Sequence, residues 1–439
     1  MHVLLIHPPI REDALPNCLP LGLAYVAAEL KRDGIRYSVF DANVERLSGS
    51  WLDKLAARVR WGGFTHVGIS AIAHQFVYVE TIVCLVRAQL PDVPIIVGGP
   101  ISVLGTQLAE WLKVYVYHGE AEGSFAQYLR QELYKSHEVF NAPALPSLAG
   151  LPYPDWSSFN MRTYLANPVG AINTNKWRGG HPEGGWAPLS MNVLASRGCP
   201  YSCTYCAHDA FGIKYRKRPV DEVLAEVKLL RDRYGISYAH LADDNVTVDR
   251  RWLTELCAGM CTLGVKWGCA GRVDCVDHPL LELMHACGCL VVGYGVESGS
   301  QKMLDGYEKG VTVEEAEAAL VATKAVFGDV DYSLMVGGPG ESDVTIQETI
   351  DLCRRTQTRP AVVFYTTPLP GTQLHYYARK TGLITDELAY VRGLGEHGQK
   401  IRCNVSGQTN EWLAAAKARI ENETKRFGAH PGAPWEEKP

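Results

Sequence analysis

Short apolar runs alternate with amphipathic stretches along the first 140 residues of the chain. Val3 to Ile6 is a continuous apolar run, and apolar residues from Leu21 to Leu30 recur at helical spacing before Gly34. Further strands are predicted at 37–40, 67–70, 95–97 and 114–117, and further helices at 76–89 and 106–112. Continuous apolar strands separated by helices predict a doubly wound α/β domain, whose parallel sheet binds ligands at the carboxyl ends of its strands.

A second alternation of strands and helices begins near residue 189. Strands are predicted at 191–195, 239–242, 266–270, 290–295, 331–336 and 362–366, and helices at 220–234, 251–263, 280–286, 313–326 and 345–355. About six strand–helix repeats fit a partial (β/α)6 barrel of TIM type, with its active site at the strand carboxyl ends.

Other segments of the chain connect or follow these two domains. Periodicity fades over residues 141–188, where prolines, glycines and tryptophans accumulate, so this segment is predicted to be a linker. We therefore expect domains at 1–140 and 189–375, followed by a helical extension at 376–439 with an amphipathic helix from Trp412 to Lys425.

Composition narrows the class of protein. A chain of 439 residues with 46% hydrophobic and 21% charged residues is typical of a globular protein with two or three domains. The net charge of -5 argues against a nucleic-acid partner. The chain has no apolar run of about 18 residues and no basic leader, so we expect a cytoplasmic protein without a membrane partner.

Three cysteines lie close together in the run from Arg197 to Cys206. Cys199, Cys203 and Cys206 can surround one metal centre if the chain forms a loop there, which Gly198 and Pro200 favour. A zinc site usually takes four ligands from two separated pairs, whereas a cubane with three cysteine ligands leaves one iron open. The spacing therefore favours an iron–sulfur cluster held by these three thiols over three ordinary core cysteines.

Ten other cysteines need a separate explanation, because a cytosolic chain does not keep a disulfide framework. Six of them can in principle hold a second cluster: Cys257, Cys261, Cys269, Cys275, Cys287 and Cys289. They are spread over a predicted helix, a strand and a turn, which favours small buried apolar residues instead.

The cysteine triplet, with Tyr205 directly before the third thiol, resembles the signature of the radical S-adenosylmethionine (SAM) superfamily. In that family SAM chelates the open iron of a [4Fe-4S] cluster. One electron then cleaves SAM to methionine and a 5'-deoxyadenosyl radical, which abstracts hydrogen from an unreactive C–H bond. The resemblance implies a [4Fe-4S] cluster and SAM as cofactors, and an electron donor such as a flavodoxin, a ferredoxin or a reductase as partner.

The first domain resembles the Rossmann-like cobalamin-binding domain of the radical SAM class that includes magnesium-protoporphyrin cyclases and natural-product methylases. The HPP opening, PLGLAYVAAEL, VGG and HGEAEG carry this likeness. It implies cobalamin contacts at the strand ends, which carry Ser70, Gly98, Gly99 and Glu120. An Asp-x-His-x-x-Gly run, the usual source of a cobalt-ligating histidine, is missing, and the alternative is a domain that is structural or holds substrate. We assign no cobalt ligand among His7, His66, His74 and His118.

Polar residues and glycines follow the barrel strands in the order of the cobalamin class, and the likeness extends from Met1 to about Gly382. They are Asp243, Asp244, Arg272, Glu297, Ser298, Gly337, Gly338, Gly340 and Pro368. Arg272 suits the SAM carboxylate, and Glu297 and Ser298 suit the ribose hydroxyls. The glycines would let the backbone approach adenine closely. The alternative for each carboxylate is a helix N-cap or a loop position.

Catalytic candidates follow the cysteine loop. His208, Asp209 or Tyr215 can act as the acid that helps a hydroxyl leave a small-molecule substrate. The basic residues Arg216, Lys217 and Arg218 are expected to form a solvated face or the entry to the following helix.

Two radical chemistries compete for the reaction. The compact tail and the missing histidine run resemble aminoglycoside diol dehydratases, as in apramycin biosynthesis, and favour radical 1,2-diol dehydration of an aminosugar-like intermediate. The alternative is cobalamin-dependent C-methylation in secondary metabolism, such as antibiotic biosynthesis. A third hypothesis, of another class, is a non-catalytic cobalamin or iron–sulfur carrier or sensor.

Overall fold

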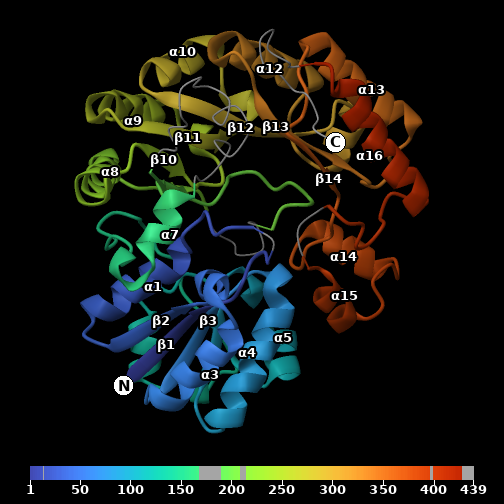
Figure 1. The fold of residues 1–439 in the computed structure, drawn as a ribbon. Coiled ribbons are helices and arrows are strands. Elements are labelled where there is room, and N and C mark those ends of the chain that lie inside the picture. The colour runs from blue at the N-terminus through green and yellow to red at the C-terminus, as the bar shows by residue number, and fades with distance from the viewer. Residues whose placement is uncertain (13, 168–188, 208–213, 396–398, 428–439) are drawn as a thin grey trace. The chain divides into compact units, whose positions relative to one another are not determined.

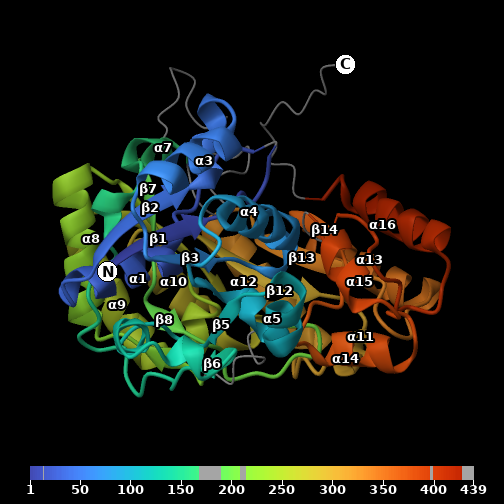
Figure 2. The same ribbon diagram turned by 90° about the horizontal axis from the view of Figure 1, so that it is seen from below.

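The computed structural model describes residues 1–12, 14–167, 189–207, 214–395 and 399–427. Its chain forms two compact units. The first unit consists of Met1–Asn167, Ala207–Pro219 and Leu369–His397, and the second of Pro168–Cys206, Val220–Pro368 and Gly398–Pro439. Each unit is built around a parallel six-stranded sheet, shown in two views (Figures 1 and 2).

The sheet of the first unit has the strand order β2-β1-β3-β4-β5-β6, and all its pairings are parallel. Its strands are β1 His2–His7, β2 Arg36–Asp41, β3 His66–Ser70, β4 Ile95–Gly98, β5 Tyr115–His118 and β6 Val139–Asn141. The five predicted strands are confirmed. The sixth, β6, was not predicted because it is a three-residue edge strand, too short to show a hydrophobic period.

The helices of the first unit bury both faces of this sheet. They are α1 Leu21–Arg32, α2 Ala42–Glu45, α3 Trp51–Trp61, α4 Phe76–Gln89, α5 Gly105–Leu112, α6 Phe125–Arg130, α7 Met161–Ala166, α14 Gln373–Lys380 and α15 Glu387–Gly393; this unit also contains the short strand β9 Arg216–Lys217. Leu4 and Ile6 of β1 pack in one core with α3, α4 and α5 (Figure 1). Val3 and Leu5 alternate with them and are buried on the opposite face, the side of α1.

Helix α3 was not predicted, and its sequence explains why. Only Leu55 and Val59 are buried among its eleven residues, so the apolar stripe is too sparse to stand out. Helices α1, α4 and α5 match the predicted segments to within two residues. Within the described residues, no helix has the length and apolar character needed to cross a membrane.

The second unit contains the partial barrel. Its sheet has the order β14-β13-β12-β11-β10-β7, again all parallel. The strands are β7 Ser190–Val193, β10 Tyr238–Leu241, β11 Lys266–Gly271, β12 Cys289–Glu297, β13 Asp331–Val336 and β14 Val362–Tyr365, with β8 Ser196–Arg197 outside this sheet. The six predicted strands, and therefore the predicted (β/α)6 architecture, are confirmed.

Helices cover one side of this curved sheet (Figure 1). They are α8 Val220–Tyr234, α9 Arg250–Leu263, α10 His278–Ala286, α11 Gln301–Gly306, α12 Val313–Phe327, α13 Asp343–Thr356 and α16 Asn410–Thr424. Successive helices α8, α9, α10, α12 and α13 contact one another, and α16 packs on α13. Helix α16 confirms the amphipathic helix predicted near the end of the chain, whereas the short helix α11 was not predicted.

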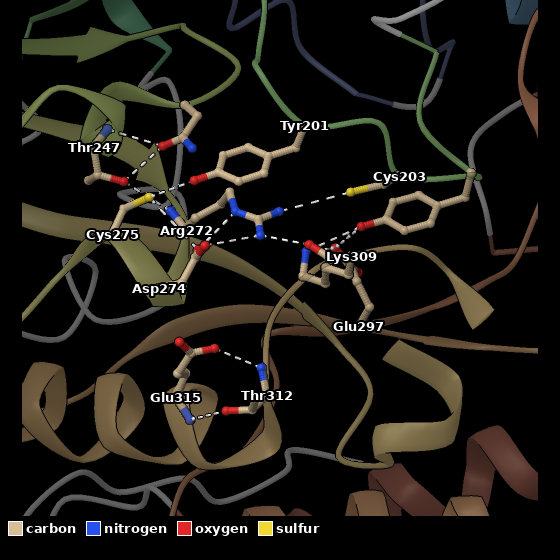
Figure 3. A network of polar contacts seen from close by, with 12 residues as sticks. Tyr201, Cys203, Thr247, Arg272, Asp274, Cys275, Glu297, Lys309, Thr312 and Glu315 are labelled. Atoms are coloured by element: carbon tan, nitrogen blue, oxygen red, sulfur yellow. Dashed lines mark hydrogen bonds and ion pairs between the residues drawn. The ribbon is translucent and has the colours of Figure 1, made fainter. Parts of the chain in front are cut away.

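Short polar side chains start the barrel helices. Asp249 accepts a hydrogen bond from the backbone of α9, and Asp277 does the same for α10. Thr312 and Glu315 form a reciprocal capping box at the start of α12 (Figure 3). These residues account for the starts of α9, α10 and α12.

A buried carboxylate fixes the turn between β13 and α13. Glu341 is 2% exposed and accepts hydrogen bonds from the backbone N–H groups of Gly337 and Gly338. Gly337 and Gly340 have φ values of 100° and 82°, which a side chain would disfavour. Burial raises the pKa of Glu341 to about 7.

A buried ion pair fixes the segment around β9 within the first unit. Arg216 donates from Nη1 to Glu120 Oε2 (2.7 Å) and from Nη2 to Glu120 Oε1 (3.0 Å), and their side chains are 13% and 5% exposed. The same Oε2 accepts from the Leu145 backbone N–H at 2.8 Å. Arg218 is 1% exposed. The solvated alternative is therefore wrong for Arg216, because a fork-shaped guanidinium can be buried where a carboxylate matches it. Arg218 is also buried, and its position two residues before α8 agrees with the helix-entry alternative.

Replacing Glu120 by alanine should destabilise the first unit, because it leaves the Arg216 guanidinium buried without its carboxylate. We expect the free energy of unfolding to fall by about 3–5 kcal/mol. Urea unfolding followed by tryptophan fluorescence measures this. The control is Glu132→Ala, which removes an ion pair with Lys135 whose side chains are 50% and 60% exposed, and it should lower the free energy of unfolding much less, because water screens this pair. Equal losses for the two variants would contradict the burial argument.

Glu341 should make stability depend on pH. Its pKa of about 7 in the folded state lies above the ordinary 4.5, so the folded protein retains a proton that the unfolded chain releases between these values. The free energy of unfolding therefore falls as pH rises through this window, by about 1.4 kcal/mol per pH unit. Glu341→Gln cannot titrate, so its profile should lack this component. Urea unfolding at pH 5 and pH 7 compares the two, and parallel profiles would refute the assignment.

Candidate functional site

The loop with the three cysteines follows β7 and β8. Cys206 donates its backbone N–H to the Cys203 carbonyl at 3.0 Å, which closes a tight turn. Thr204 donates its backbone N–H to the Tyr307 carbonyl at 2.9 Å, which fastens the turn to the end of α11. Cys203 is buried, Cys199 and Cys206 are half-buried, and none of the three forms a disulfide. Burial raises the pKa of the Cys199 thiol.

Two carboxylates after β10 hold the beginning of this loop. Asp243 accepts hydrogen bonds from the Ala195 backbone N–H at 2.7 Å and the Ser196 hydroxyl at 2.9 Å. Asp244 accepts from the Gly198 backbone N–H at 3.1 Å. Burial raises the pKa of Asp243 to about 7. The next helical turn is capped by Asn245 and α9 by Asp249, so the N-cap alternative does not explain Asp243 and Asp244.

Arg272 follows β11 and reaches the cysteine loop (Figure 3). Its Nε donates to Asp274 Oδ1 at 2.9 Å, and its Nη2 donates to Asp274 Oδ2 at 3.2 Å and to the Lys309 carbonyl at 2.7 Å. Its Nη1 donates to Cys203 Sγ at 3.9 Å. The guanidinium carbon lies 3.6 Å from the centroid of the Tyr201 ring. A buried cation is thus placed between a carboxylate and a thiol.

The charge of Arg272 is secured by its surroundings. The residue is 7% exposed. Burial lowers its pKa, but the hydrogen bonds and charge of Asp274, together with Cys203 and Tyr201, outweigh burial, so the pKa lies above the ordinary value. Tyr201, which stacks on the guanidinium, exchanges a hydrogen bond of 3.3 Å with Cys275 Sγ.

A second cation lies beside the end of β12. Lys309 Nζ donates to Glu297 Oε1 at 3.4 Å and to the Tyr205 hydroxyl at 3.2 Å. The Tyr205 hydroxyl also donates to Glu297 Oε1 at 3.0 Å, so it links the cysteine loop to this strand end. Glu297 is 7% exposed and has a φ of 69°, rare for a residue with a side chain. Such strain, of order 1–3 kcal/mol, is typical of functional sites.

The other predicted SAM contacts have structural partners of their own. Ser298 is 1% exposed and exchanges a hydrogen bond of 3.1 Å with Thr349 Oγ1. A Cβ added to Gly338 would lie 2.2 Å from the Tyr307 hydroxyl oxygen, so this glycine makes room for the tyrosine that holds the cysteine loop. Gly340 lies in the turn after β13, and Pro368 is buried beyond β14. Their contact with SAM stays a prediction.

The predicted cobalamin residues lie at the carboxyl ends of strands in the first unit. Ser70 ends β3 and is half-buried, and Gly98 ends β4. A Cβ added to Gly99 would lie 2.9 Å from the Ala71 carbonyl oxygen, and the φ of Gly99 is 76°, so the turn itself requires glycine. The carboxylate of Glu120 is engaged by Arg216, as described above. Contact of these residues with cobalamin also stays a prediction.

The catalytic candidates are only partly placed. His208 and Asp209 lie outside the described residues. Tyr215 is half-buried and belongs to the first unit. Lys309 was missed, because it follows α11 and does not come directly after a strand, where polar site residues were sought. Lys309 is only 4% exposed, and burial of a lysine is what marks it as a candidate site residue. This burial is visible only in the folded chain.

The donor set fits an iron–sulfur cluster. Within the described ranges, no three His, Cys, Asp or Glu side chains are arranged to bind a single metal ion. The fit therefore rests on three thiols outside disulfides on one short loop, with an Arg272 N–H directed at one of them. In the first unit, His7 Nε2 is buried at the end of β1 with no hydrogen-bond partner among the described residues, which leaves a polar group for a ligand such as cobalamin.

Comparison with protein families identifies both parts of the chain. Residues 193–353 match the model of the radical SAM superfamily, and residues 10–129 match that of the B12 binding domain. The likeness predicted from the cysteine triplet is confirmed. The match also supports cobalamin in spite of the missing histidine run.

Named relatives match most of the chain. An uncharacterized methyltransferase of Pyrococcus horikoshii is 26% identical over 412 residues, covering 88% of this chain and 84% of the relative. An anaerobic magnesium-protoporphyrin IX monomethyl ester cyclase of Cereibacter sphaeroides is 26% identical over 422 residues, covering 89% of this chain and 66% of the cyclase. Neither is a diol dehydratase, so the predicted resemblance to that group finds no support here.

A solved structure shares the fold. The radical SAM methyltransferase TsrM from Kitasatospora setae, with tryptophan substrate and a SAM analogue bound, superposes with a TM-score of 0.70 at 16% identity. The match covers 98% of this chain and 89% of TsrM. The chain therefore contains a B12 binding domain and a radical SAM domain, and it is a radical SAM enzyme whose cofactors are a [4Fe-4S] cluster, SAM and cobalamin.

Proposed function

We propose that this enzyme is a cobalamin-dependent radical SAM methyltransferase that acts on a carbon atom of a small polar natural-product intermediate. The observation that carries the proposal is the combination, in one chain, of a three-thiol loop in a radical SAM domain with a B12-binding domain. The methyltransferase name of the Pyrococcus horikoshii relative supports it. When bound, the cluster supplies the electron that cleaves SAM, and cobalamin supplies a carrier for the methyl group.

Methyl transfer was the alternative hypothesis of the sequence analysis, which favoured dehydration. The preference for dehydration depended on the compact tail and the missing Asp-x-His-x-x-Gly run. That run is one local motif, whereas the match to the B12 binding domain extends over residues 10–129. Of the catalytic candidates proposed for dehydration, His208 and Asp209 lie outside the described residues, and Tyr215 belongs to the first unit.

The chain's own residues have the following proposed tasks at SAM. Cys199, Cys203 and Cys206 hold the cluster. Glu297, buried and strained at the end of β12, accepts hydrogen bonds from the ribose hydroxyls. Lys309 supplies positive charge for the SAM carboxylate, together with the second N–H of Arg272 Nη1. Figure 3 shows Arg272, Lys309 and Glu297 close to Cys203 in one network of polar contacts, which supports this arrangement.

Backbone and small side chains complete the proposed cofactor contacts. Ser298 and the turn with Gly337, Gly338 and Gly340 bound the adenine side of SAM. Ser70, Gly98 and Gly99 contact cobalamin at the carboxyl ends of β3 and β4 in the first unit, where ligands of doubly wound sheets bind. Radical SAM enzymes need a reductant, and a flavodoxin or ferredoxin is the proposed donor.

Isotope transfer should separate the possible reactions. The protein, reconstituted anaerobically with iron, sulfide and cobalamin, is incubated with dithionite, methyl-labelled SAM and a panel of polar natural-product intermediates. We expect methyl label in a product detected by mass spectrometry. Formation of 5'-deoxyadenosine with an unlabelled, deoxygenated product would instead establish dehydration. A protein that binds cobalamin but consumes no SAM across the panel would support a carrier or sensor.

Each cluster thiol should be indispensable. We expect Cys199→Ala, Cys203→Ala and Cys206→Ala to lose the absorption of the four-iron cluster and at least about 100-fold of SAM cleavage, since a cubane with two thiolates is poorly held. Iron analysis and chromatography of SAM products measure both. The matched control is Cys261→Ala, an exposed cysteine on α9, which should behave as wild type. Full turnover in any of the three variants would exclude the cluster assignment.

A further inference from the structure

We propose that Arg272 tunes the cluster: its guanidinium donates a hydrogen bond to the Cys203 thiolate and raises the reduction potential of the [4Fe-4S] centre. This inference rests on the cluster that the proposed function requires. It gives Arg272 a role that does not depend on SAM, beyond the carboxylate contact assigned to it from the sequence. In the structure, Cys203 Sγ stands for the thiolate that would bind iron.

The contact is specific to one edge of the guanidinium. Nη1 lies 3.9 Å from Cys203 Sγ, a hydrogen-bond distance for the large sulfur atom. Figure 3 shows the guanidinium between Asp274 and the sulfur, with Nη1 directed at Cys203. Cys203 is 8% exposed, so little water competes for its sulfur.

The orientation of Arg272 is fixed by its other contacts. Nε and Nη2 are both engaged by the Asp274 carboxylate, and Nη2 also donates to the Lys309 carbonyl. The Tyr201 ring covers one face of the guanidinium at 3.6 Å. The guanidinium plane therefore cannot rotate without breaking several contacts, and Nη1 remains the edge next to the sulfur. Such support around a ligand atom is how proteins adjust metal centres.

Electrostatics give the sign of the effect. Reduction adds a negative charge to the cluster, and hydrogen bonds to its sulfur atoms are among the factors that set its potential. A cation that donates to a cluster thiolate stabilises the reduced state more than the oxidised state, and it does so strongly where water is excluded. Asp274 neutralises part of the charge of Arg272, but Asp274 is bonded to Nε and Nη2, the far side of the guanidinium from Cys203.

The test is the midpoint potential of the cluster, measured without SAM by redox titration followed by electron paramagnetic resonance. We expect Arg272→Gln to shift the midpoint to lower potential, so that the ratio of reduced to oxidised cluster at the wild-type midpoint falls about tenfold, as for loss of one charged hydrogen bond. Arg272→Lys keeps the positive charge but loses the fork-shaped donor group and the stacking on Tyr201. Its midpoint potential should therefore lie between those of the wild type and Arg272→Gln.

The control removes the same charge elsewhere in the second unit. Arg250 pairs with Asp277 at the surface and is 54% exposed, so Arg250→Gln should leave the potential unchanged. An equal shift in this variant would overturn the proposal, because it would reflect net charge alone.

Other outcomes separate the inference from the proposed function. A wild-type midpoint in Arg272→Gln with a full complement of iron would overturn the inference, even if SAM affinity falls. If Arg272→Gln takes up no cluster, Arg272→Lys replaces it as the test. A midpoint potential in Arg272→Lys equal to that of the wild type would then overturn the proposal. A shifted potential together with no methyl transfer by the wild-type enzyme would support the inference and refute the proposed function.

Discussion

The loop between Gly198 and Cys206 contains no helix or strand, so its shape depends on hydrogen bonds from neighbouring strand ends. Asp243 and Asp244 hold its beginning, the Tyr307 carbonyl holds its middle, and Tyr205 joins its end to Glu297. A loop that must present three thiols to one cluster cannot depend on the cluster alone for its conformation. The parallel sheet supplies this support, because its strand ends all lie at one edge.

The same strand ends also hold two buried cations beside the cysteine loop. Arg272 and Lys309 are 7% and 4% exposed, and a buried cation is costly unless it is paired. Asp274 and Glu297 pair with them, and both pairs lie against the cysteine loop. Anionic cofactor groups and a cluster that gains an electron both favour positive charge nearby. The second unit thus keeps two cations beside the thiols at limited cost to stability.

Several predicted cofactor residues prove to be required by the fold as well. Gly99 allows a turn of positive φ against Ala71, and Gly338 makes room for Tyr307. Glu120 secures a buried arginine. These demands are sufficient to explain the residue types, so contact with SAM or cobalamin has to be tested by binding and cannot be inferred from the motif. Glu297 likewise pairs with the buried Lys309 and accepts a hydrogen bond from Tyr205.

The sequence by itself determined what is local. The spacing of the three cysteines identified the cluster loop, and hydrophobic periodicity identified both parallel sheets, because each depends on residues close together in the chain. It also predicted Arg272 and Glu297 at strand ends, and both lie there, beside the cysteine loop.

Tertiary structure alone decided the rest. Arg272 contacts Cys203, which lies 69 positions away in the sequence. The burial of Arg216 depends on Glu120, 96 positions away. Lys309 follows α11 and contacts Tyr205 of the cysteine loop. A sequence pattern indicates which face of a helix or strand is apolar. It does not indicate which residue, distant in the sequence, pairs with a given charged side chain. Helix α3 and strand β6 were not predicted for a related reason: α3 has only two buried positions and the three-residue β6 has none, so neither shows a hydrophobic period.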